Sequence, residues 1–459
     1  MKKTLLLFSL CASMLGFKAQ AQEPATINIY NNAVYYGMYD QLQEAAALPE
    51  GAIRNKNWSY GKKLTEDQIA AIGNKLTINV TAEALCDDYD RIGNVNLAFV
   101  PKGATSYVYE NVERIEIGRF ITPFMNNITK TPSQVPYTFS ANNIAKILHD
   151  VTISAEYDFW IELEIYGHQG GESADQGGAQ WDFLVTGLCH DRNDVYKGSL
   201  DLVTENDPDS EESDLNYLDI LSYKYELKDY TLDGTDVLGQ TVRTINFTLD
   251  EAVPNAKFYL ITSNHGSNYG GEEYKNREHN VYLDNALVHT YKPGQYCEPF
   301  RVYNTMGNGV YGPSPRTMAY WLSRAWCPGA AIAIRDIELG DLTAGEHSFK
   351  IDVPDATFAG NQGYFPMSVY LQGYDTTTLA TKKINTATFS IAPNPVTDVA
   401  TIAAKGQEVK SVAVVNTLGQ TVWNGTTNKV DLSALKTGIY MVNVAFANGQ
   451  TAAKKVVKN

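Results

Sequence analysis

The chain has 459 residues, enough for two or three domains, and its formal net charge is −15 at pH 7. The tail from residue 388 onward carries seven Lys against three acidic residues, so the part before it is more acidic than the whole. Such a surface repels phosphate backbones and anionic membrane surfaces, which argues against nucleic acid or an anionic membrane as partner.

Residues 1–21 have the pattern of a secretory signal. Lys2 and Lys3 precede an apolar stretch over residues 5–17, and Ala19-Gln20-Ala21 forms a small-residue cleavage site. The apolar stretch is too short for a spanning helix, and no other segment reaches that length. We therefore expect an exported protein without a transmembrane anchor.

The rest of the chain is typical of an all-β protein. Its 29 Tyr and 35 Gly favour strands and turns, and short apolar runs are bounded by Gly, Asn, Asp and Pro. Helical periodicity is limited to residues 66–73 and 142–149. This spacing predicts β-sandwiches, a first domain over 22–189 and a second over 190–380.

An unusual cluster stands before the apolar run 92–100. Asp87, Asp88, Asp90 and Arg91 follow Cys86 directly. Because a buried strand holds its ends rigidly, these charged groups would keep a fixed geometry. The alternative is a charged, solvated turn leading into the strand.

Residues 159–166 read FWIELEIY, where apolar residues alternate with Glu162 and Glu164. This period of two predicts a half-buried strand with its acids on one face, and that face is by default exposed to solvent. Residues 167–178 hold His168 and four more glycines after Gly167, and this loop is a candidate for lining or covering a cleft. Residues 204–214 form an acidic run for which an interdomain loop is favoured over a calcium site, because the spacing fits no EF-hand.

A second informative stretch covers residues 263–285. Gly266, Gly270 and Gly271 allow close approach of the backbone, and the charged residues Glu272, Glu273 and Arg277 follow them. His265 and His279 beside acids raise the possibility of a metal, but the spacing fits no recognised ligand set, and we expect none. A charged loop entering a strand is the alternative.

Four cysteines remain once the signal is removed, namely Cys86, Cys189, Cys297 and Cys327. An exported protein meets an oxidising environment, so disulfides are expected. Four cysteines allow three pairings, and spacing alone does not choose among them.

These motifs resemble the peptide-N-glycosidase F family, bacterial amidases that remove whole N-linked glycans. CDDYDR (86–91) and IGRFITPF (117–124) are similar to the family's CDEWDR and IGRFITPY. GGEEYKNREH (270–279) is similar to GCAEWCFRTH, although Gly271 and Lys275 replace both family cysteines. RAWCPG (324–329) is similar to RAGWCPG with one residue deleted. The resemblance covers residues 86–339 in patches.

The resemblance implies two consecutive eight-stranded jelly-roll sandwiches packed side by side, with a cleft between them and no cofactor. It implies catalytic roles for Asp90, as the principal carboxylate, Glu273 and Glu164, with Glu156 as the alternative to Glu164. It further implies substrate-binding roles for six residues: Arg91, Tyr89, Tyr166, Tyr274, Arg324 and His265. It favours a Cys297–Cys327 disulfide and leaves Cys86 without the family's local partner.

Residues 388–459 suggest a small sandwich with turns at 417–420 and 436–438. They resemble the C-terminal sorting domain of type IX secretion cargo, which implies contact with that secretion machinery and a surface or secreted location. The whole reads as a monomeric amidase acting on N-glycoproteins or glycopeptides. The alternatives are a non-catalytic glycan-binding protein on the same scaffold and, from the double sandwich alone, a copper monooxygenase, which the scattered His disfavour.

Overall fold

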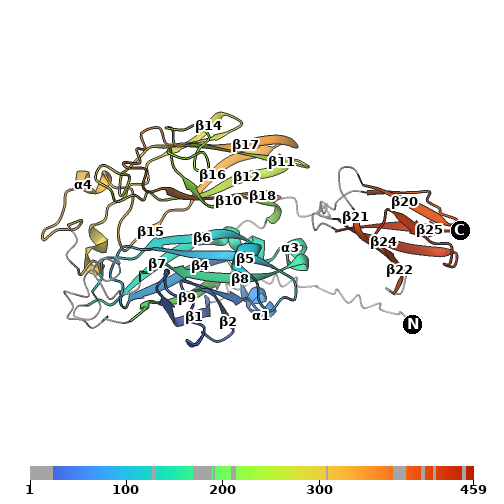
Figure 1. Ribbon diagram of the computed structural model, residues 1–459, viewed down its shortest axis with the longest axis horizontal. Coiled ribbons are helices and arrows are strands. Elements are labelled where there is room, and N and C mark those ends of the chain that lie inside the picture. The colour runs from blue at the N-terminus through green and yellow to red at the C-terminus, as the bar shows by residue number, and fades with distance from the viewer. Residues whose placement is uncertain are drawn as a thin grey trace, which may run out of the picture. The chain divides into compact units, whose positions relative to one another are not determined.

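The computed structural model describes residues 24–126, 131–168, 189, 192–207, 213–306, 309–375, 389–404, 409–416, 420–446 and 451–459 (Figure 1). The chain forms two compact units, residues 1–380 and 381–459. The expected signal at 1–21 lies outside the described residues, as do most of the loop at 167–178 and part of the acidic run at 204–214.

The first sandwich has two antiparallel sheets. One sheet has the order β1-β9-β4-β7 and the other β15-β6-β5-β8-β3-β2. The strands of the first sheet are β1 (Ala25–Tyr36), β9 (Asp194–Glu205), β4 (Lys75–Ala84) and β7 (Gln134–Ser140). Those of the second are β15 (Ala331–Ile332), β6 (Glu113–Ile121), β5 (Ile92–Pro101), β8 (Tyr157–Ile165), β3 (Ser59–Lys63) and β2 (Ala52–Lys56).

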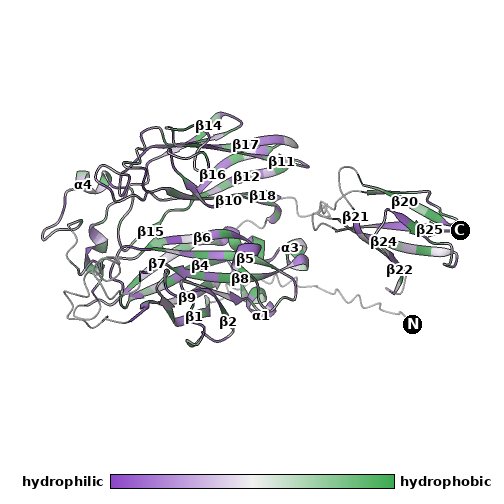
Figure 2. Ribbon diagram, viewed as in Figure 1, coloured by the Kyte–Doolittle hydropathy of each residue, from purple (hydrophilic) through white to green (hydrophobic). Residues whose placement is uncertain are grey.

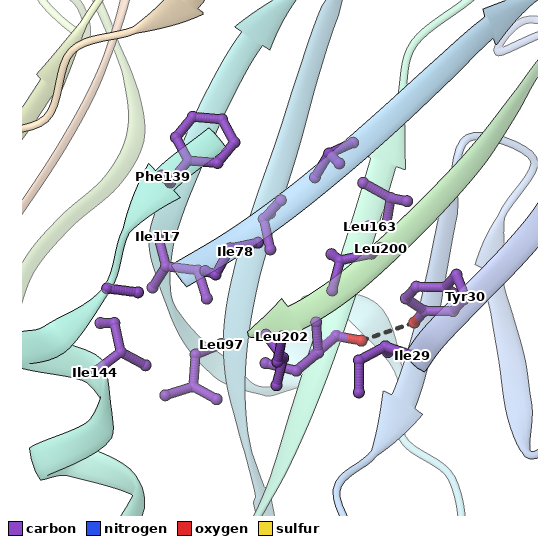
Figure 3. Packing of buried hydrophobic residues seen from close by; sticks show 14 of the residues in the cluster. Ile29, Tyr30, Ile78, Leu97, Ile117, Phe139, Ile144, Leu163, Leu200 and Leu202 are labelled. Atoms are coloured by element: carbon purple, nitrogen blue, oxygen red, sulfur yellow. Dashed lines mark hydrogen bonds between the residues drawn. The ribbon is translucent and has the colours of Figure 1, made fainter. Parts of the chain in front are cut away.

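The core of this sandwich follows from the period-two patterns of its strands. Every second residue of β4 is buried, and hydrophobic and hydrophilic positions alternate along many strands (Figure 2). Ile78, Leu97 and Leu163 pack from different strands into one cluster (Figure 3). Tyr30 is buried among them because its hydroxyl donates to the Ile161 carbonyl oxygen at 2.7 Å.

The second sandwich also pairs two sheets, with orders β10-β18-β12-β16 and β11-β17-β13-β14. Its strands are β10 (Asp214–Leu227), β18 (Phe365–Asp375), β12 (Val253–Thr262), β16 (Arg335–Leu342), β11 (Val242–Leu249), β17 (Gly345–Asp352), β13 (His279–Leu283) and β14 (Ala286–Tyr291). The all-β prediction is confirmed.

Two details correct the predicted domain organisation. Strand β9 pairs with β1 and β4, so the first sandwich extends past residue 189 and the expected boundary lies one strand too early. Strand β15 pairs with Phe120 and Arg119 at the edge of β6. With these two strands the first sandwich has ten strands in the described residues rather than eight.

Helices are few and short. They are α1 (Glu66–Ala71), α2 (Asn142–Leu148), α3 (Val151–Glu156), α4 (Met318–Leu322) and the 3-10 turns η1 (Tyr109–Asn111) and η3 (Glu298–Tyr303). Both predicted helices are confirmed. Thr65 caps α1 by accepting from the Gln68 amide, while the Gln68 side chain accepts from the Thr65 amide. Among the residues the structure describes, no helix is long and apolar enough to span a membrane.

The two sandwiches meet through a buried polar layer. Glu162 and Glu164 of β8 are both fully buried, so the prediction of a solvent-exposed acidic face is wrong. Glu162 pairs with Arg114 at 3.0 Å, and the Lys224 ammonium of β10 contacts Glu164. The acids therefore face the second sandwich, and their cost of burial is offset by these cations.

Two disulfides close long segments. The expected Cys297–Cys327 bond is confirmed, and Cys86 pairs with Cys189, which is one of the pairings left open. The Cys86–Cys189 bond joins two cysteines that are 103 residues apart, in the turn before β5 and in the segment before β9. Constraining so long a loop stabilises the folded state by about 4–5 kcal/mol in the chain-entropy treatment.

Residues 389–459 form a separate small sandwich. Its sheets have the orders β19-β20-β23 and β22-β21-β24-β25. The strands are β19 (Phe389–Ala392), β20 (Val399–Ala404), β23 (Lys429–Asp431), β22 (Thr421–Gly425), β21 (Val409–Val415), β24 (Gly438–Phe446) and β25 (Thr451–Lys458). Val414, Val442 and Val444 are buried in its core.

Candidate active site

A cavity of about 1210 Å³ receives side chains from both sandwiches. This volume is larger than that of a usual pocket for a drug-sized molecule. The first sandwich contributes Tyr89, Asp90, Arg91, Asn94, Arg119 and Tyr166, and the second contributes Lys224, Glu226, Tyr230, His265, Glu273, Tyr274 and Tyr364. The structure thus brings Asp90 and Glu273, which are 183 residues apart, to one cavity.

The turn at residues 86–91 is built around Asp87. Its carboxylate is fully buried and accepts from the Tyr89 amide at 3.0 Å, the Arg91 Nε at 2.7 Å and the His168 amide at 2.6 Å. Hydrogen bonds from three donors hold this carboxylate, and the bond from Arg91 is charge-assisted. They fix the backbone of the residues that follow Asp87 in the turn. Asp90 consequently points into the cavity while Arg91 stays paired with Asp87.

Asp90 is a carboxyl group at the cavity whose pKa is raised. It is half-buried and accepts a hydrogen bond from the Tyr274 hydroxyl. Burial and then the negative charge of Glu273 raise the pKa of Asp90 to about 8, against the opposing effects of Tyr274 and Arg91. At neutral pH this carboxyl therefore keeps its proton and can donate it.

Glu273 lies on the opposite wall, in the loop that follows β12. One carboxylate oxygen accepts from the Gly266 amide, and the other lies 3.7 Å from His265 Nδ1. His265 itself is fixed by two backbone hydrogen bonds with Tyr364, at 3.2 and 3.1 Å. Both oxygens of Glu273 therefore face a group that orients them.

The loop at 263–277 has Gly271 and Lys275 where the family motif has cysteines, and it is held by buried Glu272. This carboxylate accepts from Arg277 Nε at 2.8 Å, from Arg277 Nη2 at 2.6 Å and from the Thr357 amide at 2.6 Å. A Cβ atom on Gly271 would stand 2.7 Å from the Gly266 carbonyl oxygen, so a cysteine does not fit there without a shift of the backbone.

Tyr274 is held in an unusual conformation beside Asp90. Its φ of 65° lies in the left-handed region, which residues other than Gly, Asn, Asp and His seldom adopt. Its carbonyl oxygen accepts from the Ala325 amide at 2.7 Å, and its ring lies 4.3 Å from Trp326. Residues that keep such strain cluster at functional sites, and here the strain aims the hydroxyl at Asp90.

The other predicted site residues divide into two groups. Tyr89, Arg91, Tyr166, Tyr274 and His265 line the cavity. Arg324 does not line it in the structure. Its guanidinium lies 3.8 Å from the centre of the Tyr274 ring, on a residue of the cavity wall, so the structure places Arg324 behind Tyr274, and its contact with substrate stays a prediction.

Glu164 and Glu156 are now distinguished by position. Glu164 lies near the cavity end of β8, where it accepts from Tyr109 at 2.7 Å and from Ser59 at 3.3 Å and contacts Lys224, which lines the cavity. Glu156 is exposed at the end of α3, beside Tyr157, which pairs with Pro101 at the far end of β5 from Asp90. The position of Glu156 away from the cavity favours Glu164 over Glu156 as the second candidate acid.

Two cations at the cavity were missed in the sequence. Arg119 is fully buried and pairs with Glu116 at 2.7 Å. Lys224 has a φ of 48° at an irregularity in the pairing of β10 with β18, and its ammonium lies 3.3 Å from the Tyr166 hydroxyl. Arg119 belongs to the IGRFITPF motif and was available as a candidate, whereas Lys224 sits in no motif.

Metal ligation receives no support from the described part of the chain, where no group of three His, Cys, Asp or Glu side chains is placed to hold an ion. His279 is fully buried and stacks on Tyr291 at 4.7 Å. Burial lowers its pKa to about 4. This histidine is a core residue of β13 rather than a partner of His265.

The fold and the cavity define a double β-sandwich protein with a carboxyl-rich site between its sandwiches. Two family models, described as peptide-N-glycosidase F, N terminal, and peptide-N-glycosidase F, C terminal, match residues 26–167 and 235–372. Together they cover more than half of the chain, which belongs to the peptide-N-glycosidase F family. A third model, the secretion system C-terminal sorting domain, matches residues 390–459 and indicates a secreted or cell-surface protein.

Solved structures agree at the level of fold. PNGF-II in its P21 crystal form is 20% identical, with a TM-score of 0.53 over 76% of this chain and 65% of that one. Its C2 form gives 18% identity, a TM-score of 0.53 and coverage of 77% and 65%. The chain thus spans about two thirds of the length of PNGF-II.

A further structure is that of PNGase F, a glycosylasparaginase from Flavobacterium meningosepticum. It is 16% identical, with a TM-score of 0.47 and coverage of 78% of this chain and 97% of that one. No sequence among curated proteins matches the chain.

Proposed function

We propose that the protein is an amidase that hydrolyses the bond between asparagine and N-acetylglucosamine in N-glycoproteins or glycopeptides. The observation that carries the proposal is the pairing of Asp90 and Glu273 at one cavity, with the pKa of Asp90 raised to about 8 by burial and by Glu273. Hydrolysis of an amide by general acid–base catalysis uses two positioned groups, one that donates a proton and one that accepts a proton.

In the proposed reaction, the oxygen of a water molecule joins the amide carbonyl carbon and the carbon–nitrogen bond breaks. Glu273 orients that water and accepts its proton, and Asp90 supplies a proton to the departing nitrogen. The products are an aspartate side chain and the released glycosylamine. Each positioned acid or base contributes about 10²–10⁴-fold to the rate.

Aromatic residues supply the recognition of sugar in this proposal. Tyr89 and Tyr166 line the cavity from one side and Tyr274 from the other, and their faces suit the apolar faces of two N-acetylglucosamine residues. Tyr166 stacks on Trp58 with ring centres 4.5 Å apart, so its plane is already fixed before a sugar binds. Pre-organised rings of this kind lose little entropy on binding.

The sorting domain leads to a proposed route of export. We propose that residues 1–21 direct the chain across the inner membrane and are removed, and that the type IX secretion machinery then recognises the domain at 390–459. The mature amidase would act as a monomer. A sedimentation measurement of the secreted protein, together with its N-terminal sequence, tests both statements.

The test of the activity uses the full secreted chain and a denatured N-glycoprotein. Mass spectrometry of the product peptides is expected to show loss of the whole glycan with Asn converted to Asp, and no such product with Asp90→Asn. A single N-acetylglucosamine left on Asn would mean an endoglycosidase. Retention on immobilised glycans without any product would leave a glycan-binding protein.

A further inference from the structure

A chain of polar contacts runs from the buried interface to Glu273. Arg119 of β6 is fully buried, and both oxygens of Glu116 accept from it, at 2.7 Å each. Its Nη1 group donates to the Pro366 carbonyl oxygen at 2.6 Å and to Ser263 Oγ at 2.9 Å. Arg119 therefore joins the first sandwich to the start of the loop that carries His265 and Glu273.

Ser263 connects Arg119 with His265 through hydrogen bonds. The side chain of Ser263 is buried, and its Oγ lies 2.8 Å from His265 Nε2. A guanidinium only donates, so Ser263 Oγ accepts from Arg119. In the part of the chain that the structure describes, His265 Nε2 is the remaining hydrogen-bond partner of that hydroxyl. A hydroxyl proton directed at a bare Nε2 satisfies this donor, whereas a proton on Nε2 would leave the hydroxyl proton without a partner among the described residues.

The other ring nitrogen leads to the same assignment independently. His265 Nδ1 faces Glu273 Oε1 at 3.7 Å, and a carboxylate oxygen only accepts. A proton on Nδ1 is attracted to this oxygen, whereas a lone pair there would be repelled. The distance is longer than a direct hydrogen bond, as catalytic contacts often are before a substrate is bound.

We propose that Arg119 and Ser263 are positioning residues that hold His265 as the neutral tautomer with its proton on Nδ1, directed at Glu273. The Gly266 amide holds the second oxygen of Glu273. The carboxylate is thereby oriented from both sides toward the cavity. This role deepens the proposed amidase function, and its kinetic consequences rest on that function.

The tautomer is measured without any reference to activity. Nitrogen-15 NMR of the full chain labelled at histidine, with the His265 signals assigned by their loss in His265→Asn, is expected to show a protonated Nδ1 and a bare Nε2 at neutral pH. A protonated Nε2, alone or together with Nδ1, overturns the proposal. This outcome is separate from failure of the amidase assay.

Ser263→Ala removes the hydroxyl that connects Arg119 with His265. We expect the tautomer preference to be lost and kcat to fall about 10- to 100-fold with little change in KM, because the carboxylate is less well oriented. The matched control is Ser368→Ala. Ser368 is equally buried and donates to the same Glu116 at 2.5 Å but does not contact His265, so tautomer and kcat should be retained.

Substitution of the histidine gives a conservative rescue. An Asn amide nitrogen takes the place of Nδ1 and a Gln amide nitrogen that of Nε2, so His265→Asn should retain more activity than His265→Gln. Equal loss in both, or equal effects of Ser263→Ala and Ser368→Ala, would mean a merely structural role for the contacts and would overturn the proposal.

Discussion

The two acid-bearing walls of the cavity are held by different means. In the turn at 86–91, buried Asp87 binds Arg91, and the Cys86–Cys189 disulfide fixes the same segment. In the loop at 263–277, buried Glu272 binds Arg277, but no disulfide is present. Each wall therefore uses a buried carboxylate as an anchor and presents a second carboxylate, Asp90 or Glu273, to the cavity.

The comparison shows two loops anchored by a buried ion pair, of which only the turn at 86–91 also has a disulfide. A buried carboxylate with several donors organises the loop around it, provided that it is fully paired. Such an anchor is sensitive to substitution, because loss of one partner of the ion pair leaves the other partner as an uncompensated buried charge. The loop at 263–277 should therefore tolerate substitution less well than the turn at 86–91.

The largest expected effect concerns the two presented carboxyl groups. If the proposed roles hold, Asp90→Asn and Glu273→Gln should each lower kcat/KM by about 10²–10⁴-fold, since each removes one of the two proposed acid–base functions. Glu156→Gln is the matched control, because this exposed glutamate stands at the far end of β8 and should leave kcat/KM unchanged. Kinetics on one glycopeptide measure all three, and a strong effect of Glu156→Gln would contradict the placement of the site.

The next prediction compares the two buried carboxylates that anchor the loops, Asp87 and Glu272. Glu272→Gln and Asp87→Asn each break a buried ion pair, and each should lower the free energy of unfolding by about 2–4 kcal/mol in urea denaturation. Activity should fall further in Glu272→Gln, because the disulfide still constrains the turn in Asp87→Asn. Equal activity losses would contradict the idea that the disulfide makes the difference.

A smaller effect follows from the pKa of Asp90. Its value of about 8 in the folded protein exceeds that of an unfolded aspartate, near 4, so the folded state binds the extra proton between these values. This contribution to stability is fully present below about pH 4 and is lost as the pH rises to about 8. Asp90→Asn should therefore unfold at higher urea concentration than the wild type at pH 8, with a smaller difference at pH 5. An unchanged difference across this range would contradict the raised pKa.

The sequence predicted the β architecture because alternation and turn residues are local. Residues 75–84 alternate strictly, and the structure has them as β4. The burial of Glu162 and Glu164 could not be predicted in this way, since alternation shows that one face of a strand is polar but not what covers it. The covering groups, such as Lys224, come from another domain.

For the candidate site, the motifs identified individual candidate residues but not the contacts between them. Asp90, Glu273 and Tyr274 were recognised from short motifs and lie at one cavity. The role of Glu272 as anchor was not recognised, because its partners are Arg277 and the distant Thr357 amide. The Cys86–Cys189 pairing likewise depends on the position of β9, which no local pattern specifies.

The smallest expected effect compares one tyrosine from each wall. The Tyr166 hydroxyl lies 3.3 Å from the Lys224 ammonium, whereas the Tyr274 hydroxyl donates to Asp90. Tyr166→Phe keeps the ring stacked on Trp58 and removes a weak contact, so kcat/KM should change less than about 10-fold, mainly through KM.

Tyr274→Phe removes the hydrogen bond that lowers the pKa of Asp90, so that pKa should rise further. The pH at which kcat/KM declines should then move upward in Tyr274→Phe and stay in place in Tyr166→Phe. The pH profile of kcat/KM for the two variants distinguishes these outcomes. The same upward displacement in both variants would mean that the hydroxyl groups act through the general polarity of the cavity, and the direct contact of Tyr274 with Asp90 would lose its assigned role.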